Sequence, residues 1–293
     1  MLTVVARSSG PYREKPAEFV RGQSCQLPWA WDGLCFGVPL HEAGREGLRD
    51  VVNNAAPSAV VGGTWTLDNR SNPALTLNTS SWIDYADHPR HDQPSSALTV
   101  YVRLKKAGTP TAWGGAFSNV YSPASVDPWN SWTIGDAGAA DGKMSAAIAE
   151  TAGVMTTPDS AIITSTEYLS IFLRWNALPG TAGTADLRIL GERGQIVQQV
   201  TSAAFGSGTI RYAAGQGIRI NGNETPTPAS FNAHYSQAMV WKRRLSNIEL
   251  QALVSDPFGW YSPRREAVTV AAPFPVGPGM AAMPMTIGGS GRR

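Results

Sequence analysis

The sequence is poor in charged residues. Only 16% of its 293 residues are Asp, Glu, Lys or Arg, well below the ~25% of an ordinary globular protein. The formal net charge is +2, and the basic residues are dispersed, with only short clusters such as Lys242-Arg243-Arg244. A protein that binds nucleic acid by neutralising phosphates needs many clustered cations. We therefore expect no nucleic-acid partner.

Cysteines and long apolar runs are also scarce. Cys25 and Cys35 are the two cysteines, too few for a disulfide framework, and no other metal-binding residues lie close to them in sequence. No run reaches the ~18 apolar residues of a membrane span, and Met1–Arg7 lacks the features of a signal peptide. We therefore expect a protein made in the cytosol, with reduced thiols and no membrane partner.

Helical periodicity is nearly absent between residues 29 and 262, where strand-like segments alternate with turn signals. Every second residue of segment 97–104 is apolar, the pattern of a half-buried strand. Segment 168–175 is rich in aromatic residues, and Gly191–Gly194 separates two further strands as a hairpin. About a dozen such strands predict an all-β fold in which two antiparallel sheets pack as a sandwich.

One short helix is predicted near the C-terminus, directly after a strand at residues 233–241. Ser246 and Glu249 have the spacing of a capping box, in which each residue binds the other's backbone N–H. Leu250 and Leu253 begin an apolar face at helical spacing. Pro257 ends the helix, because proline cannot continue it and also restricts the preceding residue.

The two ends of the chain differ from this middle region. Residues 1–28 mix prolines with charges, and we expect an extended arm or a strand or two that pack on a neighbour. Residues 271–285 contain four prolines, which disfavours a helix or a central strand, yet they also contain phenylalanine and methionines. The predicted domains are therefore an arm (1–28), a sandwich (29–262) and a C-terminal tail or docking strap (263–293).

Segment 238–258 resembles the closing motif of concanavalin A-like jelly rolls of the laminin-G and pentraxin type. In that family a strand ending in Trp-x-Arg-x-Leu-Ser leads into a Ser-x-x-Glu helix and then Asp-Pro-Phe or Asp-Pro-Trp. Here the same order is Trp241-Lys-Arg-Arg-Leu-Ser246 and Asp256-Pro-Phe258. Weaker similarities at 44–54, 74–85, 98–103 and 169–175 follow the family's order. The resemblance implies a two-sheet antiparallel jelly-roll sandwich with one short C-terminal helix.

Such domains are frequent in phage structural genes and in bacterial surface proteins, although the fold does not determine function. Together with the arm and the strap, the resemblance predicts a non-enzymatic bacteriophage virion-surface protein: a capsid decoration, fibre or tail accessory subunit. It would be made in the host cytoplasm and would contact other virion proteins through the arm and the strap. We also expect it to form a homo-oligomer.

The alternative is a carbohydrate-binding or receptor-binding lectin module that recognises host-surface glycans. The chain has ten tryptophans, and most lie in predicted strands, where core packing is the usual role. Trp113, Trp129 and Trp132 lie in a Gly/Ser/Pro-rich stretch, so they are the candidates for glycan stacking.

A glycoside hydrolase is the third hypothesis. It needs two carboxylates ~5–9 Å apart across a groove. The family's glycosidases carry them on a Glu-x-Asp-x-x-Glu strand, and no such spacing occurs here. We therefore expect no catalytic residue.

A polar cluster at residues 84–92 is the remaining candidate site. Its possible metal ligands are Asp84, Asp87, His88 and His91. Nitrogen and oxygen donors suit Zn²⁺ or similar ions, and the pentraxin resemblance adds Ca²⁺, with Asp127 and Asn130 as further conceivable ligands. The two histidines lack the i, i+4 spacing that directs two imidazoles at one ion. We favour an exposed polar loop and expect no cofactor.

Overall fold

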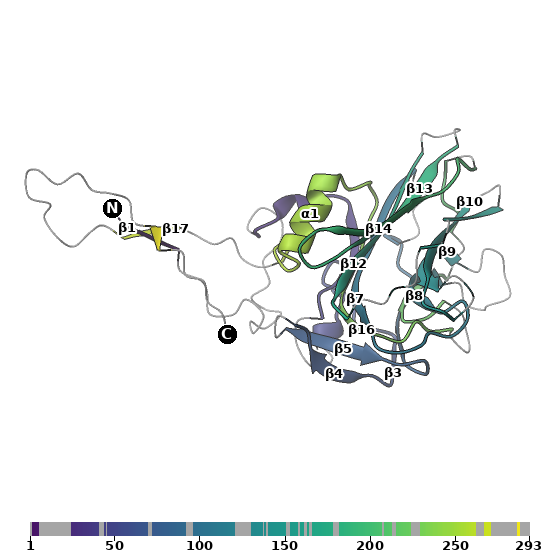
Figure 1. Ribbon diagram of the computed structural model, residues 1–293, viewed down its shortest axis with the longest axis horizontal. Coiled ribbons are helices and arrows are strands. Elements are labelled where there is room, and N and C mark those ends of the chain that lie inside the picture. Colours follow the sequence, from purple (N-terminus) through teal and green to yellow (C-terminus); the bar gives the residue numbers. More distant parts are fainter. Residues whose placement is uncertain are drawn as a thin grey trace, which may run out of the picture. The chain divides into compact units, whose positions relative to one another are not determined.

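Figure 1 shows the computed structural model of the protein. It describes residues 2–5, 25–40, 44, 46–69, 72–91, 96–120, 130–136, 138, 140–150, 153–157, 159–160, 163, 166–177, 182–206, 208–212, 215–223, 229–261, 267–270 and 286–287. By its internal contacts the chain divides into two compact units. The larger is Asp32–Pro257, and the smaller unites Met1–Trp31 with Phe258–Arg293.

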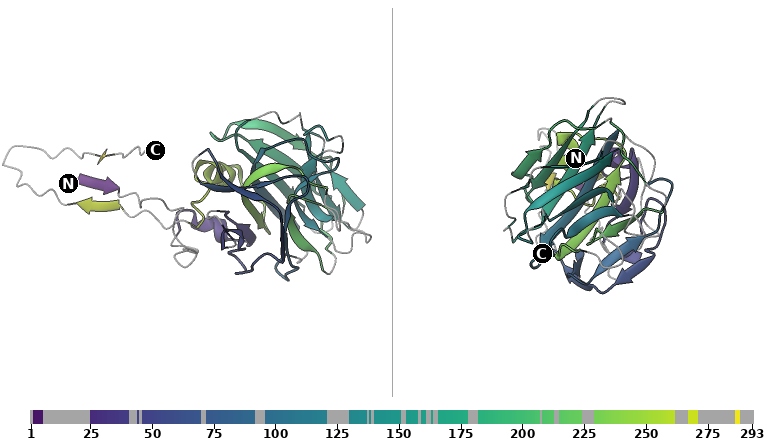
Figure 2. Two further views of the ribbon diagram at one scale, coloured as in Figure 1. Left: turned by 90° about the horizontal axis from the view of Figure 1, so that it is seen from below. Right: turned by 90° about the vertical axis from the view of Figure 1, so that its right-hand side faces the viewer.

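Two antiparallel sheets make up the larger unit (Figures 1 and 2). The seven-stranded sheet consists, in spatial order, of β11 (Gly153–Thr156), β10 (Met144–Glu150), β9 (Asn130–Asp136), β8 (Gly115–Val120), β15 (Gly217–Ile220), β6 (Trp82–Tyr85) and β3 (Ala59–Val61). The eight-stranded sheet consists of β14 (Ile196–Thr201), β13 (Thr184–Leu190), β12 (Leu169–Asn176), β7 (Ala97–Lys106), β16 (Ala233–Trp241), β5 (Pro73–Leu77) and β4 (Thr64–Leu67), with β2 (Leu34–Val38) also beside β16. The predicted all-β sandwich is confirmed.

The hydrophobic core lies between the two sheets, and β7 shows how the sequence builds it. The alternate apolar residues of this strand all belong to the core: Leu98, Val100, Val102 and Leu104. The sequence predicted a half-buried strand, which is wrong for most of β7, because Thr99, Tyr101 and Arg103 on its other face are buried as well. Segment 243–247 crosses that face, and the Thr99 hydroxyl donates to Arg243 O and accepts from Leu245 N.

The closing segment has the predicted form. Strand β16 pairs with β7 along its length, with β5 over Ala233–Tyr235 and with β2 over Ala238–Trp241, so it is a central strand. Helix α1 (Asn247–Ser255) follows, and its capping box is present. Glu249 N donates to Ser246 Oγ at 3.3 Å, and Ser246 N donates to Glu249 Oε2 at 2.6 Å.

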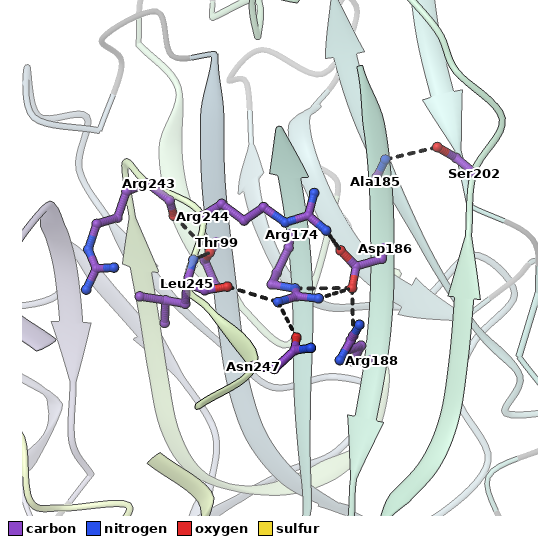
Figure 3. Close-up of polar contacts among 10 residues, drawn as sticks. All are labelled: Thr99, Arg174, Ala185, Asp186, Arg188, Ser202, Arg243, Arg244, Leu245 and Asn247. Atoms are coloured by element: carbon purple, nitrogen blue, oxygen red, sulfur yellow. Dashed lines mark hydrogen bonds and ion pairs between the residues drawn. The ribbon is translucent and has the colours of Figure 1, made fainter. Parts of the chain in front are cut away.

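A buried ion cluster fastens the start of α1 to the outer face of the eight-stranded sheet (Figure 3). Arg174 on β12 donates to Asp186 Oδ2 on β13 at 2.6 Å, and both side chains are 3% exposed. The same guanidinium donates to Leu245 O and to Asn247 Oδ1, each at 2.9 Å. Arg244 adds a 2.7 Å bond to Asp186 Oδ1. The sequence carried no signal for this cluster, which joins residues far apart in the chain.

The smaller unit pairs the two ends of the chain. Strand β1 (Leu2–Val5) lies between β17 (Ala267–Val270), to which it is antiparallel, and β18 (Thr286–Ile287), to which it is parallel. This terminal sheet therefore joins the predicted arm to the predicted strap. The proline-rich run 271–285 lies outside the described residues. Whether the arm and strap contact a neighbour stays a prediction.

Two 3₁₀ helices complete the described elements, at Pro28–Trp31 and Glu46–Leu48. In the smaller unit, the rings of Trp31 and Trp260 lie 5.7 Å apart between centroids, and Trp31 Nε1 donates to Trp260 O at 2.5 Å. Cys25 and Cys35 are both buried, and they form no disulfide with each other. Within the described part of the chain, no helix has the length and apolar character needed to cross a bilayer.

Candidate functional site

The Trp113 side chain forms an exposed aromatic surface on the larger unit. It lies in the loop that follows β7, and it is 62% exposed. Trp113 is the only aromatic residue among the described ones whose side chain is largely exposed. An exposed indole contributes little to the core and leaves a large apolar ring with a polar N–H available to a ligand.

The backbone at Trp113 is strained but firmly held. Its φ is +60°, a left-handed conformation that costs a bulky L-residue roughly 1–2 kcal/mol. Gly114 N donates to Thr111 O at 2.9 Å, and Thr111 N donates to Ser230 O at 3.0 Å. The Asn223 side-chain amide donates to Trp113 O. Strain of this kind persists only where the surroundings enforce it, often at ligand sites.

The indole rests on a neighbouring loop. A Cβ added at Gly138 would come within 2.6 Å of the six-membered ring of Trp113, so only glycine leaves room for this approach. The Asp136 carboxylate holds the loop in place by accepting from the backbone N–H groups of Gly138, Ala140 and Gly142 at 2.9–3.0 Å. We call Trp113, Gly138 and Asp136 with their two loops the Trp113 platform.

Charged groups flank the platform. Lys143 and Asp141 form an ion pair at 3.1 Å. The backbone N–H of Lys143, followed by its side chain, lowers the pKa of the Asp141 carboxyl. The Lys106 amine lies against Gly142, where an added Cβ would collide with it. An indole face with charged and polar neighbours can stack on the C–H face of a sugar while they bind its hydroxyls.

The other two tryptophan candidates have different outcomes. Trp132 is 1% exposed and packs edge-on against Phe117, with ring centroids 5.0 Å apart. Its prediction as a glycan-stacking residue is wrong, because its position in β9 directs the side chain into the core. Trp129 lies outside the described residues. The sequence also gave no reason to choose Gly138 or Asp136, although 136–142 is visibly rich in glycine and aspartate.

The predicted metal candidates do not converge on one point. Arg219 donates to both Asp84 oxygens, at 2.6 and 2.9 Å, and Trp82 Nε1 donates to Asp84 at 3.1 Å. Asp87 accepts from Gly215 N at 2.9 Å. Both carboxylates therefore already accept hydrogen bonds from groups of the protein. Among the described residues, no group of three or more His, Cys, Asp and Glu could hold an ion.

His88 and His91 of the 84–92 cluster lie next to each other, and His91 is buried beside Asn53 and Asp50. His91 is 5% exposed, so the exposed-loop interpretation is wrong for it. Its Nε2 lies 3.2 Å from Asn53 Nδ2 and 3.9 Å from Asp50 Oδ2. The His88 ring lies 5.4 Å from that of His91, and burial, followed by this neighbour, lowers the pKa of His88. Asp127 and the side chain of Asn130 lie outside the described residues.

No family model and no curated protein matches the sequence. Solved structures do resemble the fold. The binding domain of Paraclostridial Mosquitocidal Protein 1 has 15% identity and a TM-score of 0.56, over 77% of this chain and 52% of that one. Botulinum neurotoxin type C, whose cell entry depends on interaction with two ganglioside molecules, has 10% identity and a TM-score of 0.53, over 76% and 50%.

The binding domain of botulinum neurotoxin serotype D/C has 9% identity and a TM-score of 0.53, over 76% of this chain and 51% of that one. The present chain thus spans about half the length of these structures. At such low identities the likeness establishes the fold alone: an antiparallel β-sandwich that these structures share.

Proposed function

We propose that this protein is a non-enzymatic binding module that recognises a glycan at the Trp113 platform. The observation that carries the proposal is an indole held 62% exposed on a strained backbone with φ +60°. Exposure and strain both cost free energy, and a preorganised binding surface explains why both are retained. The fold shared with toxin binding domains supports the proposal.

The chemistry beside the platform favours binding over catalysis. The Asp136 carboxylate is occupied by three backbone N–H groups, and Asp141 is paired with Lys143. A glycosidase needs one carboxyl group that keeps a proton and a second that faces it across the substrate. We propose that the module retains and releases its glycan unchanged.

A glycan array followed by calorimetric titration tests this function. The intact protein should bind a defined set of glycans, and Trp113→Ala should reduce the affinity by about five- to 150-fold, if sugar stacking contributes as much as the about 1–3 kcal/mol of base stacking on an aromatic ring. Ile196→Ala, at a residue that is 57% exposed on β14, is the matched control and should bind normally. An array without signal, with and without Ca²⁺, would contradict the proposal.

We further propose that the module is displayed on the surface of a bacteriophage particle, attached through the terminal sheet. The supporting observation is that both ends of the chain pair in one sheet, β17-β1-β18, within a unit separate from the sandwich. Purified particles from the phage that encodes the chain should contain the protein in stoichiometric amounts by mass spectrometry. Its absence from the particle would contradict this placement.

A further inference from the structure

A surplus of positive charge surrounds Asp186 on the outer face of the eight-stranded sheet (Figure 3). Three guanidinium groups donate to this one carboxylate: those of Arg174 at 2.6 Å, Arg188 at 2.9 Å and Arg244 at 2.7 Å. Within the described part of the chain, none of the three arginines forms an ion pair with any other acidic side chain. Two of the three guanidinium groups therefore have no carboxylate of their own.

The Arg174 guanidinium is fully occupied. Its Nε and Nη2 both donate to Asp186 Oδ2, and its Nη1 donates to Leu245 O and Asn247 Oδ1. Burial lowers the pKa of Arg174, and the positive charges of the two other arginines lower it further, against the opposing effect of Asp186. Arg174 thus adds to the charge surplus but has no nitrogen left for a ligand.

Arg188 and Arg244 keep donors that the protein does not use. Arg188 donates only through Nε, to Asp186 Oδ2, and Arg244 only through Nη2, to Asp186 Oδ1. Among the described residues, the other guanidinium nitrogens of both side chains meet no acceptor, and none of these nitrogens is buried. Because one carboxylate already bridges the two groups, an oxyanion of similar size can bridge their free nitrogens from the solvent side.

Two uncharged polar side chains of β14 lie beside these arginines. In the register of β13 and β14, Arg188 lies opposite Gln199, and Asp186 lies opposite Thr201. Opposite residues of an antiparallel pair share a face of the sheet, and both Gln199 and Thr201 are exposed. An amide and a hydroxyl can donate to an anion without adding negative charge. We call Arg188, Arg244, Gln199 and Thr201 the Arg188–Arg244 site.

From these contacts we infer that the Arg188–Arg244 site binds a terminal phosphate group, of the kind that inorganic phosphate and sugar phosphates share. Such a group carries a charge of about −1.5 to −2 at pH 7, which matches the two surplus positive charges, whereas a carboxylate neutralises only one. Arginine presents its donors as a planar fork that binds two phosphate oxygens at once. This inference goes beyond the proposed function, because the site uses no residue of the Trp113 platform.

Calorimetric titration of the intact protein at low ionic strength tests the inference, with inorganic phosphate and a hexose monophosphate as probes and acetate for comparison. Both phosphates should bind and raise the unfolding temperature. Acetate should bind more weakly, because it leaves one positive charge unpaired. Tighter binding of the hexose monophosphate than of inorganic phosphate assigns the site to a sugar phosphate, and the reverse order assigns it to free phosphate.

Two arginine variants test the residues of the site. Arg188→Met and Arg244→Met should each weaken phosphate binding about tenfold, as expected for a lost hydrogen bond from a charged group. Arg193→Met is the matched control, because Arg193 is exposed in the turn between β13 and β14 and its loss removes the same charge without touching Asp186. Trp113→Ala should also bind phosphate normally, which separates this inference from the proposed function.

Gln199 offers a pair of variants that leaves the buried cluster intact. Gln199→Glu should weaken phosphate binding and Gln199→Lys should strengthen it, because each places a charge beside the site at an exposed position. Urea unfolding should show native stability for both. The inference is overturned if neither phosphate binds, if acetate binds as tightly as phosphate, if Arg193→Met loses as much affinity as Arg188→Met, or if the two Gln199 variants bind alike.

Discussion

Two tryptophans in one Gly/Ser/Pro-rich stretch show how position decides the role of a residue. Trp113 is 62% exposed and Trp132 is 1% exposed. Trp132 occupies a core-facing position of β9, opposite Ile148 of β10. Trp113 lies in a loop and rests on Gly138, a contact that no local pattern announces. Residue type alone could therefore propose both candidates but could not choose between them.

Gly138→Ala tests the support of the Trp113 platform. The added Cβ would come 2.6 Å from the indole, and the φ of +105° disfavours alanine by itself. We expect the glycan affinity to fall as far as in Trp113→Ala, because the indole must move. Gly44→Ala is the matched control, since Gly44 has φ +117° and nothing within 4 Å of the added Cβ.

Glycan titration measures the loss of glycan affinity in the two glycine variants, and denaturant unfolding measures their loss of stability. Both glycine variants should lose stability through backbone strain, by roughly 1 kcal/mol. Only Gly138→Ala should lose glycan binding. Equal binding by the two variants would show that the indole does not depend on this contact.

His234 gives a pH prediction at the same scale. Burial, followed by Lys105, holds its pKa in the folded protein below the ordinary 6.5, so the unfolded chain takes up the proton first as the pH falls. The folded state then loses stability from about pH 6.5 down to the lowered pKa. The effect is small, because the side chain is only half-buried.

Urea unfolding between about pH 7 and pH 5 measures this slope. His234→Gln should flatten it. His88→Gln should do so separately, since the pKa of His88 is also lowered. An unchanged slope in both variants would contradict the assigned pKa directions.

Among the elements, helix α1 and the eight-stranded sheet are joined by the cluster around Asp186. Local signals predicted the helix well, because the capping box and the apolar spacing lie within a few residues. The cluster needs Arg174, Asp186 and Arg244 from three separate segments. Its existence could not follow from the sequence, because these three residues lie in segments that are far apart in the chain.

Arg174→Met should be among the most destabilising single changes. It removes one partner of a carboxylate that is 3% exposed and leaves Leu245 O without this donor. Breaking a buried pair costs about 3–5 kcal/mol. Arg188→Met is the control, because Arg188 contacts the same Asp186 from a side chain that is 15% exposed. Denaturant unfolding should show a clearly smaller loss of unfolding free energy for Arg188→Met than for Arg174→Met. Equal losses would contradict the conclusion that the buried Arg174–Asp186 pair is the more stabilising one.

The whole molecule combines a sandwich with a separate unit made from both ends of the chain. The structure pairs the predicted arm and strap with each other in the terminal sheet, and their expected contact with a neighbour stays a prediction. Pairing of residues 2–5 with 267–270 and with 286–287 joins the two ends of the chain. Such a contact has no local signature, so composition could only mark both ends as different from the middle.

Val4→Pro should disrupt the terminal sheet. Val4 sits in the central strand β1, opposite Val268 and Ile287, and proline removes a ladder donor there. Hydrogen exchange at residues 267–270 should accelerate, incorporation into phage particles should fall, and glycan binding should stay unchanged. Thr3→Val keeps the strand and is the control. Normal incorporation of Val4→Pro into phage particles would contradict the proposal that the terminal sheet attaches the protein to the particle.

The expected homo-oligomer is also a property at this scale. Light scattering of the intact protein measures the mass directly, and a purely monomeric protein at micromolar concentration would contradict the expectation.

The sequence by itself determined the all-β class, the two-sheet sandwich and the closing strand and helix. These depend on strand alternation, turn residues and helix caps, which act within a few residues. Only the tertiary structure decided which tryptophan is exposed, why Asp84 pairs with Arg219, and how the two ends meet. Each of these depends on side chains brought together from distant segments, whose pairing is set by sheet order and register.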